Sequence, residues 1–174
     1  MDQSAFTDGN LDELFAGKVA ESREFRSWLL SRTKFAKLWP VARLLDEEQR
    51  AARNGKTWWR NWWRHLPEYE GDFATRILLV FEIEQTNLRF ALHIENIPPF
   101  GGFEHNQAEA YRPRALQMMR RGRHLGYMDF ETALLAPQAF ILNEPRAELF
   151  DRRIPYETIA GFLPEFALAD RAAA

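Results

Sequence analysis

The stretch RILLVFEIEQTNLRFALHIENI, residues 76–97, decides the fold class of this chain. Two runs rich in β-branched and aromatic residues, 76–84 and 88–97, flank Gln85-Thr86-Asn87, a pattern typical of a β-hairpin. Both runs are mostly apolar instead of alternating, which predicts strands that are covered on both faces. We therefore expect this hairpin to lie inside a sheet that helices flank.

Upstream of the hairpin, apolar residues recur with the spacing of helices. We expect one helix over residues 10–31, with a dip near Gly17 that can divide it, and a second helix over 41–54. A tryptophan block follows, in which four side chains have the spacing of one helix face: Trp58, Trp59, Trp62 and Trp63. We interpret this block as core or interface; the alternative is a platform on which bases stack.

Downstream of the hairpin, the pattern predicts a turn at 98–102 and a helix over about 104–121. A strand over 132–141 and helices over about 144–151 and 155–163 complete the expected elements. This order predicts an α/β fold with a mixed central β-sheet flanked by helices. We expect a single domain over 1–174, with a helical N-terminal part (10–66) and a sheet-containing core (about 70–163).

Composition narrows the class of protein. The chain has no cysteine, which excludes disulfides and thiolate-bound metals. No apolar run approaches the roughly 18–20 residues of a membrane-spanning helix, and the N-terminus lacks the apolar core of an export signal; we expect a cytoplasmic protein with no membrane contact. The net charge of −2 conceals a basic segment whose arginines are candidates for nucleic-acid binding, with a solvated helix face as the alternative: Arg112, Arg114, Arg120, Arg121 and Arg123.

The segment HIENIPPFGGFEHNQAEAYRPRA, residues 93–115, carries the candidate chemistry. Glu95 lies near the end of a predicted strand, and Gln107 and Tyr111 stand at i and i+4 on the next predicted helix. This arrangement resembles the PD-(D/E)XK nuclease superfamily, in particular its compact bacterial restriction and defence members. ETALLAPQAFI (131–141) and RRIPYETIAGFL (152–163) look like the later strand and final helix of those members.

The resemblance implies a restriction-endonuclease-like core and descent from Mg²⁺-dependent DNA endonucleases. It implies Glu95 as a ligand of Mg²⁺, a cation that prefers oxygen ligands, and Gln107 and Tyr111 as residues that orient the site. A Glu on the first helix often completes the family's set, and Glu13 or Glu21 is the candidate here.

Two positions depart from the family's pattern. Ile97 stands where the family has lysine, and Arg76 stands where compact members have the aspartate of the first strand. A cation in place of a metal-holding carboxylate reverses the local electrostatics. Arg76 could instead form an ion pair with Glu95 in the space of the metal, whereas Asp72 is the acid near enough to replace the missing ligand.

Three hypotheses follow. The first is a nuclease-like protein with impaired cleavage that keeps DNA binding. The second is a non-catalytic interaction or regulatory protein that contacts a partner protein through the tryptophan block. The third is an active variant endonuclease that uses Asp72 and Glu95 with Mg²⁺. A homodimer is expected only by analogy with restriction enzymes, and His93, on the strand face of Glu95, is expected to be structural.

Overall fold

The computed structural model describes residues 8–53, 57–60, 62, 67–69, 75–121 and 125–171. Within these ranges a five-stranded sheet has the order β1-β2-β3-β4-β5. Its strands are β1 (Ala42–Leu44), β2 (Ile77–Ile83), β3 (Leu88–Asn96), β4 (Asp129–Ala136) and β5 (Arg152–Pro155). The pairs β1–β2 and β2–β3 are antiparallel, while β3–β4 and β4–β5 are parallel. The predicted α/β class with a mixed central sheet is confirmed.

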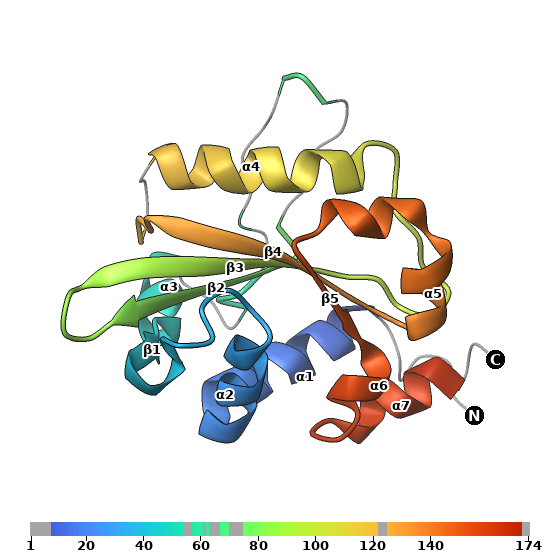
Figure 1. Cartoon of the computed structure of the whole chain (residues 1–174), viewed down its shortest axis with the longest axis horizontal. Helices are drawn as coiled ribbons and strands as arrows, with labels where there is room; N and C mark the ends of the chain where they lie inside the picture. The colour runs from blue at the N-terminus through green and yellow to red at the C-terminus, as the bar shows by residue number, and fades with distance from the viewer. Residues whose placement is uncertain are drawn as a thin grey trace.

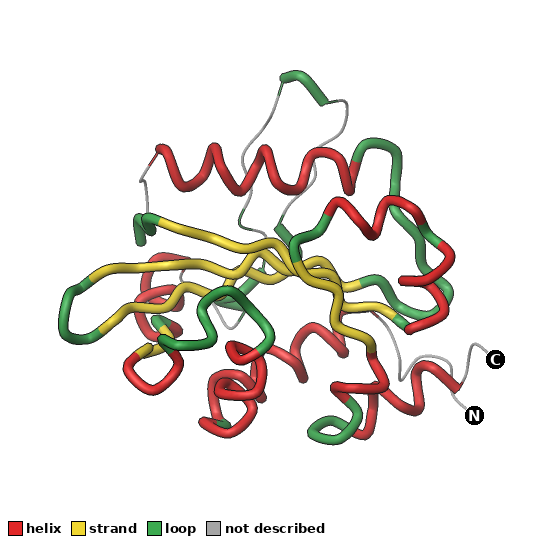
Figure 2. The backbone as a smooth tube through the Cα atoms, viewed as in Figure 1, coloured by secondary structure: helices red, strands yellow, loops and turns green. Residues whose placement is uncertain are grey.

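Helices cover both faces of this sheet (Figure 1). The long helix α4 lies over one face, and α1, α2, α6 and α7 lie against the other, as the tube in Figure 2 also shows. The helices are α1 (Asp8–Glu21), α2 (Arg23–Ser31), α3 (Asp46–Arg53), α4 (Gln107–Arg121), α5 (Gln138–Asn143), α6 (Tyr156–Ile159) and α7 (Pro164–Arg171). Short 3₁₀ turns occur at η2 (Trp39–Val41) and η3 (Pro145–Leu149).

The predicted hairpin is confirmed, and it forms the middle of the sheet. β2 and β3 pair from Ile77↔Ile94 to Ile83↔Leu88, and Asn87 takes the left-handed backbone conformation, with φ 54°, in the turn between them. One face of the pair packs into the core under α1 and α2 through Ile77, Leu79, Phe81, Phe90, Leu92 and Ile94. Leu78, Val80 and Ala91 pack on the other side. Because both faces are covered, an unbroken apolar run is what burial requires.

The N-terminal helix predictions were partly wrong in their bounds. The helix expected over 10–31 breaks at Ser22 and not near Gly17, because the Ser22 hydroxyl accepts a hydrogen bond from the Phe25 N–H at 3.1 Å and caps α2. The helix expected over 41–54 is strand β1 followed by α3. Residues 42–44 are extended because they pair with β2. A segment of three residues is too short for its own sequence to predict a strand.

Near the C-terminus, the strand expected over 132–141 ends at Ala136, and Pro137 precedes α5. The helix expected over 144–151 is the 3₁₀ turn η3. Strand β5 was not predicted; it pairs in parallel with β4 and buries only Ile154 fully, so its apolar signal is weak.

The three described tryptophans of the block, Trp58, Trp59 and Trp62, lie in the core, and the helical spacing predicted for them was wrong. Trp58 and Trp59 lie in a turn, and Trp62 forms an isolated bridge with Thr75. The exposed fractions of Trp58, Trp59 and Trp62 are 2%, 3% and 7%. Trp63 lies outside the described residues. These three rings therefore offer little surface for contact with a partner protein or with bases.

Candidate functional site: a buried polar network at the end of β3

Glu95 and Gln107 meet where β3 ends and α4 begins. Glu95 is buried, with 1% of its surface exposed, and its Oε2 accepts a hydrogen bond from Gln107 Nε2 at 3.1 Å. Its Oε1 accepts from the backbone N–H of Asn96 at 3.2 Å. Gln107 is itself held by the Glu104 N–H, which donates to Gln107 Oε1 at 2.9 Å. The sequence placed these two residues on neighbouring elements, and the structure joins them directly.

Tyr111 lies one turn along α4 from Gln107 and is also buried, with 2% exposed. Its hydroxyl oxygen accepts a hydrogen bond from the backbone N–H of Arg76 at 3.1 Å. Burial raises the pKa of Tyr111, and the neighbouring charge of Glu95 raises it further. Tyr111 therefore stays a neutral phenol that fixes the start of β2 against α4.

The carboxyl of Glu95 is a weak acid in this environment. Burial raises its pKa from the ordinary 4.5 to about 8; the positive charge of Arg76 opposes this shift, and Asp12 adds to it. At neutral pH Glu95 is therefore mostly a neutral carboxylic acid that can donate as well as accept a hydrogen bond.

Arg76 pairs with Asp12, a residue of α1, and not with Glu95 as the sequence suggested. Arg76 Nε lies 2.5 Å from Asp12 Oδ2, and the other oxygen, Oδ1, accepts from Asn96 Nδ2 at 2.6 Å. The Tyr156 hydroxyl then donates to Asn96 Oδ1 at 2.5 Å. Asp12 is fully buried, and burial raises its pKa while Arg76 and Asn96 act to lower it. The chain of contacts ties α1, β2, β3 and α6 together.

Sequence reasoning missed Asp12, Asn96 and Tyr156. The first-helix candidates Glu13 and Glu21 are both exposed, so neither reaches the network. Asp12 could have been found because it lies among the apolar positions of α1, next to Leu11 and three residues before Phe15, where an acid requires a partner. Nothing local to Tyr156 signals that its hydroxyl meets a strand sixty residues away.

The described residues do not fit a Mg²⁺ ion at this place. No group of three or more acidic, histidine or cysteine side chains with metal-binding geometry occurs in the described part of the chain. Both oxygens of Asp12 are taken by Arg76 and Asn96, and Glu95 is mostly protonated at neutral pH. Ile97, which the resemblance places where nucleases of that superfamily have lysine, is 3% exposed and packs in an apolar cluster. Asp72, the proposed replacement ligand, lies outside the described residues.

The basic segment does not form one arginine surface. Arg114 is 2% exposed and lies over the ring of Tyr111, 5.3 Å from its centroid, so it is not available to phosphate. Arg112 forms an ion pair with Asp151, and Arg120 is exposed. The side chain of Arg121 and the whole of Arg123 lie outside the described residues.

His93 is a buried hydrogen-bonded residue. Its Nε2 lies 2.7 Å from the Tyr127 hydroxyl and its Nδ1 3.2 Å from the Thr75 hydroxyl. Burial, with the charge of Arg114 as a second cause, lowers the pKa of His93 to about 3. The imidazole is therefore neutral at ordinary pH, and at 1% exposure it contacts no solvent-borne ligand.

Searches against protein-family models, curated proteins and solved structures each gave no significant match for this chain. Of the helices that the structure describes, none combines the length and the apolar character that spanning a bilayer demands.

Proposed function

We propose that this chain is a PD-(D/E)XK nuclease-like protein that has lost metal-dependent cleavage and acts by binding DNA. The Arg76–Asp12 ion pair carries the proposal, because a cation and its partner carboxylate fill the place where the resemblance puts a metal. A guanidinium can neutralise these acids, but it cannot activate water as a metal does.

The order of the elements supports this proposal. The antiparallel pair β2–β3 is followed by α4 and then by β4, which returns parallel to β3. A helix of the N-terminal part, α1, supplies an acid to the end of β3. Glu95, Gln107 and Tyr111 lie together against that end. Each feature agrees with the arrangement that the resemblance implies.

DNA binding rests on Arg120, an exposed basic side chain in the last turn of α4. Its test is fluorescence anisotropy of a labelled duplex at several salt concentrations. We expect affinity to fall steeply with salt, because each phosphate contact releases a counterion. Arg120→Gln should weaken binding and reduce the salt slope by about one. Glu109→Gln, an exposed acid on the same helix, is the matched control and should not weaken it. Absence of binding even at low salt would reject this part of the proposal.

The loss of cleavage is tested by rebuilding the family's pattern. Arg76→Asp with Ile97→Lys places a third carboxylate beside Asp12 and Glu95 and restores the lysine. We expect Mn²⁺ to raise the melting temperature of this double variant but not that of the wild type, because clustered carboxylates bind a hard cation. Metal-dependent plasmid cleavage by the double variant, abolished by adding Glu95→Ala, would establish an eroded nuclease site. A double variant that folds but gains neither property would contradict it.

A further inference from the structure

A second polar region lies along β5, the edge strand at the other end of the sheet from β1. A surface pocket of about 410 Å³ opens there, lined by Ser31, Arg32, Asp151, Arg152, Arg153 and Ile154. Three arginines and a single acid thus surround one pocket. They come from two distant parts of the chain, the end of α2 and the strand β5, which the fold brings together.

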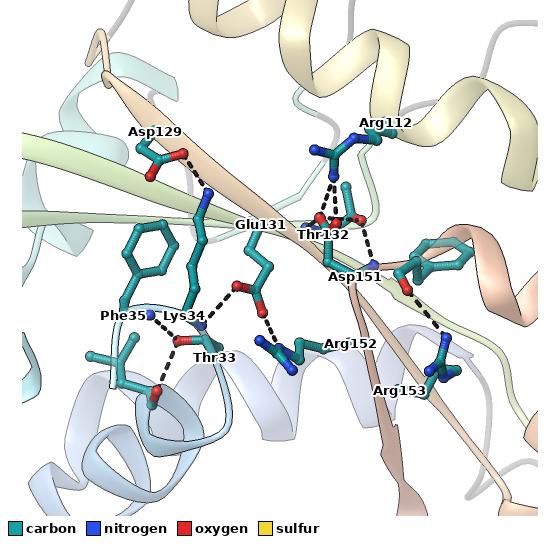
Figure 3. Close-up of polar contacts among 12 residues, drawn as sticks. Thr33, Lys34, Phe35, Arg112, Asp129, Glu131, Thr132, Asp151, Arg152 and Arg153 are labelled. Atoms are coloured by element: carbon teal, nitrogen blue, oxygen red, sulfur yellow. Dashed lines mark hydrogen bonds and ion pairs between the residues drawn. The ribbon is translucent and has the colours of Figure 1, made fainter. Parts of the chain in front are cut away.

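The one acid of the pocket is already neutralised from the other side. Both carboxylate oxygens of Asp151 accept hydrogen bonds from Arg112 Nη1, with Oδ2 at 2.6 Å. Asp151 Oδ2 also accepts from the backbone N–H and the hydroxyl of Thr132, at 2.8 and 2.9 Å. Figure 3 shows Asp151 reaching toward Arg112 and Thr132. Arg112 therefore neutralises Asp151. Glu131 and Glu148 pair with Arg152 and Arg153, so the four arginines around the pocket exceed these three acids by one charge.

The arginines of the pocket are only partly engaged by the protein. Arg152 donates through Nε to the buried acid Glu131 at 2.6 Å, which fixes the guanidinium while both terminal nitrogens remain without a hydrogen bond to any described residue. Arg153 uses Nη1 for the exposed Glu148 at 3.0 Å and for the Phe150 carbonyl at 3.5 Å. The guanidinium carbon of Arg32 lies over the ring of Trp28, 4.6 Å from its centroid, in a cation–π contact.

Rigid placement distinguishes this pocket from an ordinary basic surface. Glu131 is 2% exposed and also accepts a hydrogen bond from the backbone N–H of Lys34 at 2.8 Å. The same acid thus anchors Arg152 and the segment that follows Arg32 (Figure 3). Planar guanidinium groups held in fixed positions recognise phosphate by paired hydrogen bonds.

We propose that this pocket is a binding site for a phosphate group, held by Arg32, Arg152 and Arg153. The inference does not depend on nuclease ancestry or on Arg120, the arginine on which the proposed DNA binding rests. A phosphate of this kind belongs either to a small phosphate monoester or to the backbone of a nucleic acid, and the same donors recognise both.

The experiment is isothermal titration of the whole chain at constant ionic strength with three probes: pyrophosphate, a 5′-mononucleotide, and a single-stranded oligonucleotide without terminal phosphate. Arg32→Gln and Arg153→Gln should each weaken the probe that binds by about tenfold, the effect of losing one charge-assisted contact. Arg152 is not substituted, because its loss would leave the buried carboxylate of Glu131 without its positively charged partner.

Arg146→Gln is the matched control. The exposed fraction of the Arg146 side chain, 34%, is almost that of Arg153, 33%, and Arg146 also pairs with one glutamate, outside the pocket. Binding of pyrophosphate or the mononucleotide alone identifies a small phosphate ligand, whereas oligonucleotide binding that depends on Arg32 and Arg153 identifies a backbone phosphate. Absence of binding to all three probes, or equal affinity in all variants, overturns the inference.

Discussion

Replacing Glu95 by glutamine should stabilise the protein at neutral pH and change how its stability depends on pH. Glutamine keeps the size of the side chain, and its amide oxygen can accept from one of the two donors that Glu95 meets, the Asn96 N–H or Gln107 Nε2. It removes the capacity to ionise together with one acceptor oxygen, and only the ionisation makes stability depend on pH. The substitution therefore isolates the cost of charging a buried carboxyl.

The magnitude follows from the pKa of about 8 in the folded protein and the ordinary value of 4.5. Between these values the folded state binds a proton that the unfolded state has released, so the stability of the wild type falls as pH rises, by about 1.4 kcal/mol per pH unit. From about pH 5.5 to about pH 7.5 the wild type should lose about 2–3 kcal/mol relative to Glu95→Gln.

The assay is urea unfolding of both proteins at these two pH values, with Glu13→Gln as the control. Glu13 is the exposed neighbour of Asp12 on α1, and its substitution should leave the pH dependence of the wild type unchanged. The difference in unfolding free energy between Glu95→Gln and the wild type should widen as pH rises. Parallel pH profiles would show that Glu95 ionises freely and would refute the reasoning.

Three further outcomes are expected. His93→Gln should make the free energy of unfolding fall less as the pH is lowered. The pKa of His93 is about 3 in the folded protein and 6.5 ordinarily, so below pH 6.5 the unfolded state binds a proton that the folded state does not. Between about pH 7.5 and pH 5 the wild type should therefore lose about 2 kcal/mol relative to the variant, and equal profiles would contradict this. Asp12→Ala should destabilise the protein by about 3–5 kcal/mol, since it leaves a partly buried guanidinium without its carboxylate; Glu13→Ala, measured in the same thermal or urea unfolding, should cost under about 0.5 kcal/mol, and similar costs would count against the network. Asp151→Ala should cost about 1–3 kcal/mol because it leaves the Thr132 N–H unpaired. Glu148→Ala, which breaks an exposed pair with Arg153, should cost at most about 1 kcal/mol. An equal loss for both would show that the Asp151 contacts contribute little.

The middle of the fold could be read from the sequence, because burial on both faces leaves a long apolar signature. The hairpin of β2 and β3 and the helix α4 follow from this signature and from helical spacing. The edge strands β1 and β5 could not be read. Each is three or four residues long and owes its conformation to pairing with its neighbour, which local propensity does not encode.

In the candidate site, too, some residues could be predicted from the sequence and others could not. Glu95, Gln107 and Tyr111 were singled out by their spacing together with the resemblance to the nuclease superfamily, and the structure places all three at the end of β3. The sequence offered Glu95 as an alternative partner of Arg76 and did not find Asp12, because Asp12 is sixty-four residues away along the chain and only the packing of α1 under the sheet brings it near. The prediction that Arg114 belongs to a nucleic-acid-binding surface was also wrong, because the number of arginines in a segment does not show that Arg114 is buried over the ring of Tyr111.

The proposal that metal-dependent cleavage has been lost is tested most directly by incubating the purified wild type with supercoiled plasmid and either Mg²⁺ or Mn²⁺. We predict that the plasmid stays supercoiled over hours at an excess of protein, because the pair of Arg76 with Asp12 leaves no place for a catalytic cation. Nicking or linearisation that requires the metal and disappears in Glu95→Ala would contradict the account.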